Sequence, residues 1–340
     1  PYVLVAQDGC GRLRGLLPLA RTRSGVLVPC GANEGAVGLD VVAPSCDAAA
    51  IAAGVLAHLE ARPWRRIRLS GVLAGGALHG ALRRSAPGRM HEQVSTYCPY
   101  LSTARPWEEY LLGQKKRHRH ELRRKLRRAM EVPGTSVRWV EEPADVPAAL
   151  ATLFELHARR FADKGEHTKF SGAALRAFHT RYAEELASRN ELVLGILERD
   201  GRPLAGVYGF RCHGATGLFQ SGFDPAPDAA GTSEALRIQL LKNQAADPTQ
   251  RELDLLDGCY PWKLRLASGV RRQFDVDLYP QTVRGFLAWG LRKAWRTLKQ
   301  RVASLLRKRA CPGECGAVIN PAHCRRAGCP DADVHHPRAA

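Results

Sequence analysis

Three side chains that can move a proton or hold an anion follow one predicted strand. The strand is expected at Glu252 to Leu256, and the turn after it carries Asp257, Tyr260 and Lys263. Asp257 can act as a base or orient an amine, Tyr260 can donate a proton, and Lys263 can hold a phosphate or stabilise an oxyanion. A lysine with the usual pKa of its type is charged and cannot act as a base. The alternative is a plain Asp-Gly turn with an exposed lysine.

A second group surrounds the start of a helix predicted over Ser233 to Ala245. Gly231, Thr232 and Ser233 lie where unpaired N–H groups and the positive end of the helix dipole can receive phosphate oxygens. An ordinary serine N-cap explains the same residues.

The strand before this helix offers backbone donors for a developing oxyanion. If its edge is splayed, Leu218 to Phe223 present unpaired N–H groups. We assign Phe219, Ser221 and Gly222, together with Gly231, Thr232 and Ser233, to one ligand-binding site. Interior glycines also mark bulges and turns, so Gly222 alone does not decide between the two.

The elements that position these groups follow from apolar spacing and turn residues. The first hundred residues predict three strands, a helix, a strand, a helix and a strand; the second half adds a three-stranded antiparallel meander. This order predicts an α/β fold of two units with mixed, largely antiparallel sheets flanked by helices. We divide the chain into a first unit, 1–103, a second unit, 104–310, and a Cys-rich tail, 311–340. The expected helices are 48–61, 75–84, 107–130, 146–164, 171–188, 233–245 and 285–309.

Four stretches carry a resemblance to a known family. They are Trp107-Glu108-Glu109-Tyr110-Leu111, Arg202-Pro203-Leu204-Ala205-Gly206, Ser221-Gly222-Phe223-Asp224-Pro225, and Asp257-Gly258 with Tyr260 and Lys263. In this order they resemble GNAT-like acyltransferases of the CelD/BcsL type, the cellulose-biosynthesis acetyltransferases, and more distantly the Fem-type aminoacyl transferases. The resemblance covers roughly residues 1 to 300, with a shortened first half, and we expect the natural chain to begin before Pro1.

The resemblance implies two GNAT-like units with the active cleft in the second. It implies transfer of an acyl group, with acetyl as the expected one, from acetyl-CoA or another acyl-CoA to an amine or hydroxyl of a cell-envelope or polysaccharide-related acceptor. Two departures stand out. The loop Asp228-Ala229-Ala230-Gly231-Thr232-Ser233 keeps one glycine of the usual donor loop, and Trp262 replaces a tyrosine before Lys263. His157 and His213 are further candidate bases, although a lone histidine is more often structural.

The net charge of +18 is concentrated in two runs. Between Lys115 and Arg128 lie nine Lys or Arg residues and one acid, Glu121. This run is either a solvated helix face or a grip on an anion, including tRNA. The tRNA reading leads to a rival function, an aminoacyl-tRNA-dependent Fem-like transferase, although aromatic residues for base stacking do not interleave with the run. A catalytically inactive GNAT-like binding module is the third alternative.

The second basic run belongs to a predicted amphipathic helix, Gly285 to Arg309. Leu287, Leu291, Trp295, Leu298, Val302 and Leu305 recur at three- and four-residue spacing opposite basic residues. This face either docks onto the catalytic unit or attaches to an anionic membrane surface. No apolar run is long enough to span a bilayer. We therefore expect a cytoplasmic protein, either free or peripheral to the inner face of the membrane.

Four cysteines crowd into the tail. Cys311, Cys315, Cys324 and Cys329 lie in a segment rich in Pro and Gly that has no core of its own. Tetrahedral zinc is one way to order such a tail, but the spacing is not that of a common zinc ribbon. We expect disorder rather than zinc or disulfides there.

Overall fold

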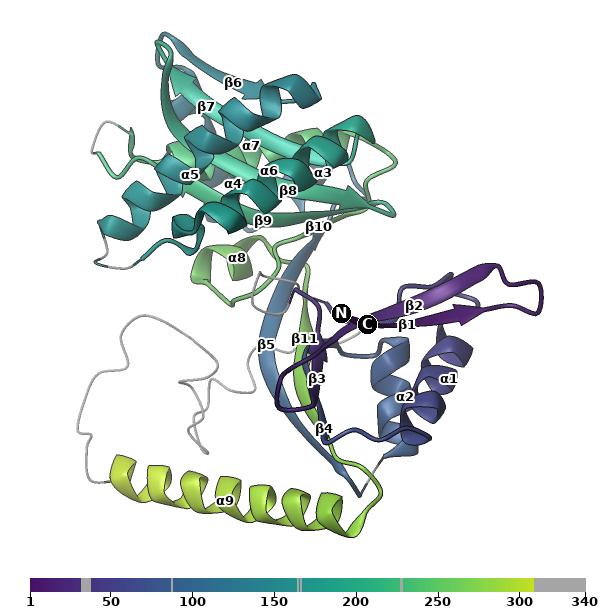
Figure 1. Ribbon diagram of the computed structural model, residues 1–340. Coiled ribbons are helices and arrows are strands. Elements are labelled where there is room, and N and C mark those ends of the chain that lie inside the picture. Colours follow the sequence, from purple (N-terminus) through teal and green to yellow (C-terminus); the bar gives the residue numbers. More distant parts are fainter. Residues whose placement is uncertain (32–37, 87, 164, 166, 227–228, 309–340) are drawn as a thin grey trace. The chain divides into compact units, whose positions relative to one another are not determined.

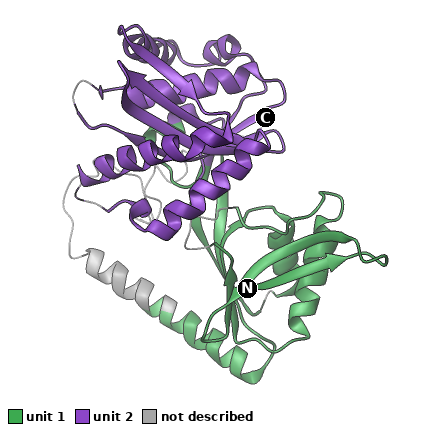
Figure 2. Cartoon of the chain, turned by 45° about the horizontal axis from the view of Figure 1, so that its top comes forward, with its two compact units in different colours: residues 1–98, 257–264, 270–340 green, residues 99–256, 265–269 purple. Residues whose placement is uncertain are grey.

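The computed structural model describes residues 1–31, 38–86, 88–163, 165, 167–226 and 229–308, and within the last helix the side chains of 296 and 299–308 are not described. The predicted tail, with its four cysteines, lies outside the described residues. The chain forms two compact units (Figure 2). The first unit contains Pro1–Cys98, Asp257–Leu264 and the chain from Val270 on, and the second contains Pro99–Leu256 and Arg265–Gly269.

The first unit is a mixed sheet in the order β1-β2-β3-β4-β11-β5 with two helices packed on it (Figure 1). β3 and β4 are parallel, and the pairs β1–β2, β2–β3 and β4–β11 are antiparallel. The buried core joins strand residues such as Leu19 and Ile67 to Leu56 and Leu82 of the helices. The elements are β1 (Tyr2–Gln7), β2 (Leu13–Arg21), β3 (Val26–Pro29), α1 (Ala48–Glu60), β4 (Arg66–Leu73), α2 (Ala77–Ser85), β5 (Met90–Ser102), β11 (Gly269–Leu278) and α9 (Val283–Lys308).

The second unit is a sheet in the order β5-β10-β9-β8-β7-β6, in which only β9 and β10 are parallel among the described pairs. Six consecutive residues of β7, Leu192 to Leu197, are buried, so helices cover both faces of the sheet here. The elements are α3 (Trp107–Leu112), α4 (Lys116–Met130), β6 (Thr135–Trp139), η1 (Pro143–Asp145), α5 (Val146–Ala162), η2 (Lys169–Ser171), α6 (Ala173–Ser188), β7 (Leu192–Arg199), β8 (Arg202–Cys212), β9 (Ala215–Phe223), α7 (Thr232–Ala246) and β10 (Glu252–Asp254), with α8 (Pro261–Leu266) after them.

The predicted fold class is confirmed, since both units are mixed, largely antiparallel sheets flanked by helices. One local expectation was wrong, and one strand was missed. The single helix expected at 107–130 is two helices, because Gly113 ends α3 with its N–H bonded to Glu109 O and Lys115 has an extended backbone before α4. The strand β11 was not predicted from the sequence.

The sequence of β11 looks polar, and its buried charge is neutralised by residues that are distant in the chain. Asp277 is buried, and its Oδ1 accepts a hydrogen bond from Arg66 Nε at 2.9 Å and lies 3.5 Å from Arg68 Nε. Since β11 pairs with β4, the chain returns to the first unit at β11. The chain therefore changes unit after Cys98, Leu256, Leu264 and Gly269, whereas the sequence division separated its two units by a single cut at 103/104.

Candidate functional site

The strand β9 has one open edge. β10 pairs in parallel with Ala215–Gly217 only, after which Leu255 N donates to Pro99 O of β5 and the chain leaves β9. Beyond Gly217, no strand among the described residues pairs with this edge. The sequence could not show this divergence, and the structure contains it.

The backbone groups on that edge can be identified by alternation. Asp224 N donates to Leu204 O of β8 at 2.8 Å, so residues 224 and 222 face β8. Because successive residues of a strand point to opposite edges, Phe223 and Ser221 face away from β8. Consistently, Ser221 O accepts from Arg160 Nη1 at 3.1 Å rather than from a strand.

A β-bulge lies at the start of the open edge. Tyr208 pairs with Gln220 and Gly209 with Leu218, which leaves Phe219 as the extra residue. Its ring packs against those of His179 and Tyr208, with centroids 5.2 and 5.8 Å apart. The bulge turns the local backbone out of the regular ladder, so Phe219 marks where β9 can offer a backbone group to a ligand.

The N-terminus of α7 has no side-chain cap among the described residues. Gly231, with φ of 84°, is left-handed, and Thr232 turns its hydroxyl back to donate to Ala229 O at 2.7 Å. Ser233 Oγ accepts from Arg237 Nη1 at 2.7 Å. The serine N-cap offered as an alternative is therefore not formed, and within the described part of the chain no side chain accepts from the first-turn N–H groups.

Two arginines near this helix were missed by the sequence reasoning. Burial lowers the pKa of Arg237 to about 10, Glu234 opposes this, and the nearby charge of Arg160 lowers it further. Arg160 also stacks near the rings of Phe161 and Phe223, at 5.6 and 5.3 Å. The acid in the first turn, Glu234, is neutralised by Lys125 Nζ at 2.9–3.0 Å. Positive charge thus gathers at the start of α7; only the Ser233–Arg237 spacing hinted at it.

Helix α5 packs closely on β9 at Gly222. A Cβ there would lie 2.5 Å from His157 N, so this glycine has a packing role whether or not it also contacts a ligand. His157 is buried with Nδ1 2.8 Å from Thr168 Oγ1 and Nε2 3.2 Å from Gln220 Oε1. Burial lowers its pKa to about 4. With both ring nitrogens engaged, His157 ties α5 to β9 and is not an available base; the other candidate, His213, lies in an exposed left-handed turn.

Two of the stretches that carry the family resemblance meet at the end of β9. Asp224 Oδ2 accepts from Arg202 Nη2 at 2.8 Å, and Asp224 Oδ1 accepts from Ala226 N at 3.0 Å. The hydrogen bond from Arg202 is the main reason why the pKa of Asp224 is lowered, and the ion pair to Arg202 adds to it. These contacts hold the exit of β9 in place before the loop to α7.

The predicted catalytic segment, Asp257 to Lys263, is a bend and short loop that runs into the start of α8, and it belongs to the first unit. Lys263 is 8% exposed, and its Nζ donates to Asp257 O at 2.6 Å. Thr96 Oγ1 donates to Asp257 Oδ1, and Gly258, with φ of 97°, donates its N–H to Tyr97 O at 3.1 Å. The lysine is therefore not the exposed residue of a plain turn; it closes the segment from inside.

Tyr260, immediately before α8, presents its side chain to solvent. It is 54% exposed, and its ring centroid is 5.6 Å from Lys263 Nζ. The structure thus brings Asp257, Tyr260 and Lys263 together, and separately brings the donor residues Phe219, Ser221, Gly222, Gly231, Thr232 and Ser233 into the second unit.

Comparison with known proteins agrees with the geometry of β9 and α7. Residues 116–264 match the family described as "Acetyltransferase (GNAT) domain". This region is GNAT-like. Three solved structures are similar over most of the chain, each with a TM-score of 0.56. They are the DUF2156 C-terminal domain of a protein from Agrobacterium fabrum named as a lysylphosphatidylglycerol synthetase (14% identity, 84% of this chain and 86% of that one), L-PGS from Bacillus licheniformis (13%, 85% and 88%), and FemX (11%, 81% and 87%).

These identities are low, so the three structures show the fold alone, and a comparison with curated proteins gives no match. The GNAT-like region contains all nine predicted site residues, from Phe219 to Lys263. It includes the open edge of β9 and the start of α7, and it ends within α8.

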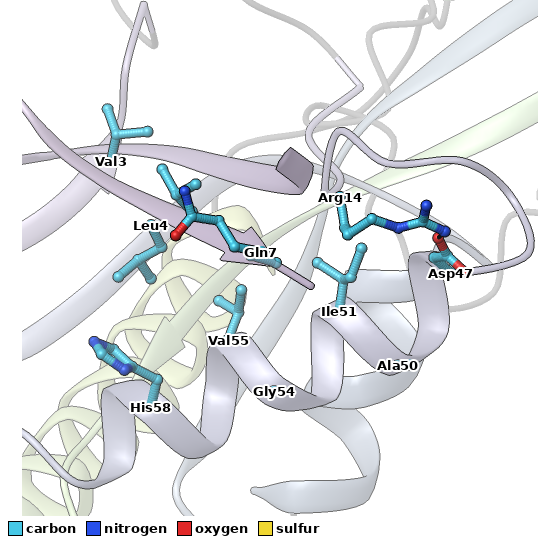
Figure 3. A pocket seen from close by; sticks show the side chains of 12 residues that line it. Val3, Leu4, Gln7, Arg14, Asp47, Ala50, Ile51, Gly54, Val55 and His58 are labelled. Carbon is cyan, nitrogen blue, oxygen red and sulfur yellow. Dashed lines mark hydrogen bonds and ion pairs between the residues drawn. The ribbon is translucent and has the colours of Figure 1, made fainter. Parts of the chain in front are cut away.

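A groove of about 650 Å³ lies outside the GNAT-like region, in the first unit between β1 and α1 (Figure 3). Its walls are mixed, with Leu4, Ile51 and Val55 among the apolar residues and the ion pair of Arg14 and Asp47 at one end. None of the predicted site residues lines it.

Proposed function

We propose that this chain is an acyltransferase of the CelD/BcsL type. It takes an acyl group, acetyl first, from acyl-CoA and transfers it to an amine or hydroxyl of a cell-envelope or polysaccharide-related acceptor. The observation that carries the proposal is the open, bulged edge of β9 beside an uncapped helix start. A cytoplasmic site of action fits a donor of this kind.

The residues of the second unit fit the parts of such a donor. The first-turn N–H groups of α7, with Arg160 and Arg237 nearby, suit a pyrophosphate. The outward N–H of Ser221, whose carbonyl accepts from Arg160, and the outward backbone groups of Phe223 suit the amides of an extended pantetheine arm, as an added strand would be held. A backbone N–H at the bulge can stabilise the oxyanion that forms when the thioester carbonyl is attacked.

The chemistry requires one proton to leave the acceptor and one to reach the thiolate. The acceptor's lone pair attacks the carbonyl carbon, the C–S bond breaks, and the acyl group stays on the acceptor. We assign Asp257 to orient the acceptor or take its proton, and Tyr260 to protonate the thiolate. Lys263 positions the segment through Asp257 O, which adds a positioning role to the phosphate or oxyanion role expected from the sequence.

Calorimetry with acetyl-CoA, longer acyl-CoAs and free CoA tests the donor. Arg237→Gln should weaken binding about ten- to a hundredfold, because a charge-assisted hydrogen bond to phosphate is lost. Arg181→Gln, which removes the same charge from the exposed face of α6, is the matched control and should bind as the wild type does. Absence of binding by every acyl-CoA would overturn the proposal.

A specific observation favours the rival function. On α4, basic side chains including Lys116, Arg123, Arg124 and Arg127 are exposed, while Leu122 and Ala129 are buried on the opposite face. Fem-type enzymes, which the sequence distantly resembles, take an aminoacyl group from tRNA. Tight, salt-sensitive binding of tRNA without binding of acyl-CoA would therefore indicate the aminoacyl-tRNA transferase. Binding of neither would indicate an inactive GNAT-like module.

A further inference from the structure

Helix α9, whose course is seen in Figure 1, carries exposed apolar side chains between Val283 and Leu298. The exposed fractions are large for apolar side chains: Val283 77%, Phe286 50%, Leu287 62%, Leu291 73%, Trp295 63% and Leu298 53%. Their spacing of one, three and four residues places them on one side of the helix. A stripe of this kind, with an aromatic residue near each end, is an interaction surface rather than scattered exposure.

The opposite side of α9 makes the contacts with the unit that carries the helix. The ring of Trp289 stacks on His91 with centroids 5.6 Å apart, and His91 Nε2 lies 3.1 Å from Trp289 O. Arg292 Nε lies 3.6 Å from the buried carboxylate of Asp277. At 100° per residue, the centre of the stripe lies close to Leu298, and Trp289 and Arg292 lie on the far side of the helix from it. Within the first unit, α9 is thus held by its back, and its apolar side is presented outward.

The charge of α9 selects the partner. Residues 283–308 contain eight Lys or Arg residues and no acid. Pairing with the same helix of a second copy would bring two such sets of like charges together, whereas an anionic bilayer offers complementary headgroups over an apolar layer. Long cationic side chains such as the exposed Lys293 can extend to the headgroups while the stripe enters the acyl boundary.

We propose that α9 binds in the plane of an anionic lipid bilayer, with the stripe from Val283 to Leu298 in the interface and the basic residues at the headgroups. None of the described helices is long and apolar enough to cross a bilayer, which agrees with a helix that lies on the membrane. This proposal is independent of the acyltransferase proposal.

Flotation of the full chain with vesicles tests it. Vesicles of phosphatidylcholine with about one third phosphatidylglycerol should carry the wild-type protein, and vesicles of phosphatidylcholine alone should carry much less. The double variant Leu291→Gln/Leu298→Gln should bind anionic vesicles at least about tenfold more weakly, because two apolar anchors are lost. The matched control is Leu13→Gln/Leu112→Gln, which changes two leucines exposed by 60% and 69% on β2 and α3. It should float as the wild type does.

Three results would overturn the proposal. The first is equal flotation of the Leu291/Leu298 variant and the wild type. The second is equal binding of the wild type to neutral and anionic vesicles. The third is a wild-type protein that does not float but forms a dimer, detected by light scattering, which the Leu291/Leu298 variant does not form. That result would assign the stripe to self-association.

Discussion

We expect Gly222→Ala to loosen the contact between α5 and β9. An added Cβ would meet two backbone atoms of α5, His157 N at 2.5 Å and Leu156 C at 2.8 Å. Neither can rotate away as a flexible side chain would. To restore an ordinary contact of 3.4 Å, the helix would have to withdraw by roughly 0.9 Å from the first of these atoms. Overpacking of this kind costs about 1–3 kcal/mol of folding free energy.

Hydrogen exchange measured by mass spectrometry on the full chain is the assay, because it reports each element separately. Amides of α5 and β9 should exchange about five- to a hundredfold faster than in the wild type, which is the population factor for about 1–3 kcal/mol. Under the proposed function, affinity for acyl-CoA should fall as well, since the open edge of β9 moves.

Gly54→Ala is the matched control for this variant. Nothing lies within 4 Å of a Cβ at Gly54, which is in the interior of α1. Alanine there favours the helix by about 1 kcal/mol, so α1 should exchange no faster than before. Wild-type exchange of α5 and β9 in Gly222→Ala would refute the reasoning, because the close approach could then not exist as described.

Four further variants separate catalytic from structural roles. Tyr260→Phe keeps the ring beside Lys263 and should lower kcat about tenfold or more with little change in donor affinity. Lys263→Met should also lower kcat about tenfold or more with little change in donor affinity. Full activity of both variants in steady-state kinetics would remove these residues from the mechanism. Between pH 6.5 and about 4, His157 binds a proton in the unfolded chain but stays neutral in the folded one, because burial lowers its pKa to about 4. The free energy of unfolding should therefore fall by up to about 3 kcal/mol as the pH falls over this range. In urea titrations, the free energy of unfolding of His157→Gln should depend less on pH than that of the wild type. Because the pKa of Asp224 is lowered in the folded chain, its carboxylate stabilises the fold at pH values above the unfolded pKa of about 3.9, and this stabilisation is lost as the pH falls through the folded pKa. Asp224→Asn should therefore lower the free energy of unfolding by about 1 kcal/mol at pH 7 and by less at pH 3. A loss that does not change with pH would contradict the ion pair with Arg202.

Local patterns in the sequence predicted the parts of the molecule that depend on neighbours in the chain. The meander of the second unit is an example, since its turns at Asp200-Gly201 and His213-Gly214 use left-handed backbone at all four residues. Helices with strong apolar periodicity, such as α5, were also predicted, because one turn of a helix already shows its buried face. The assignment of Asp257, Tyr260 and Lys263 to catalysis also comes from the sequence, and it stays a prediction.

Contacts between distant segments decided the rest. Leu253 of β10 pairs with both Leu101 and Thr216, and only this arrangement leaves the edge of β9 open. Lys263 looks like a surface residue in the sequence, yet the fold buries it against Asp257 O. In the strand β11, the buried Asp277 is neutralised by Arg66 from more than two hundred residues away. Spacing along a chain shows which face of an element is apolar, but which segment covers that face depends on packing over the whole fold, and this only the tertiary structure contains.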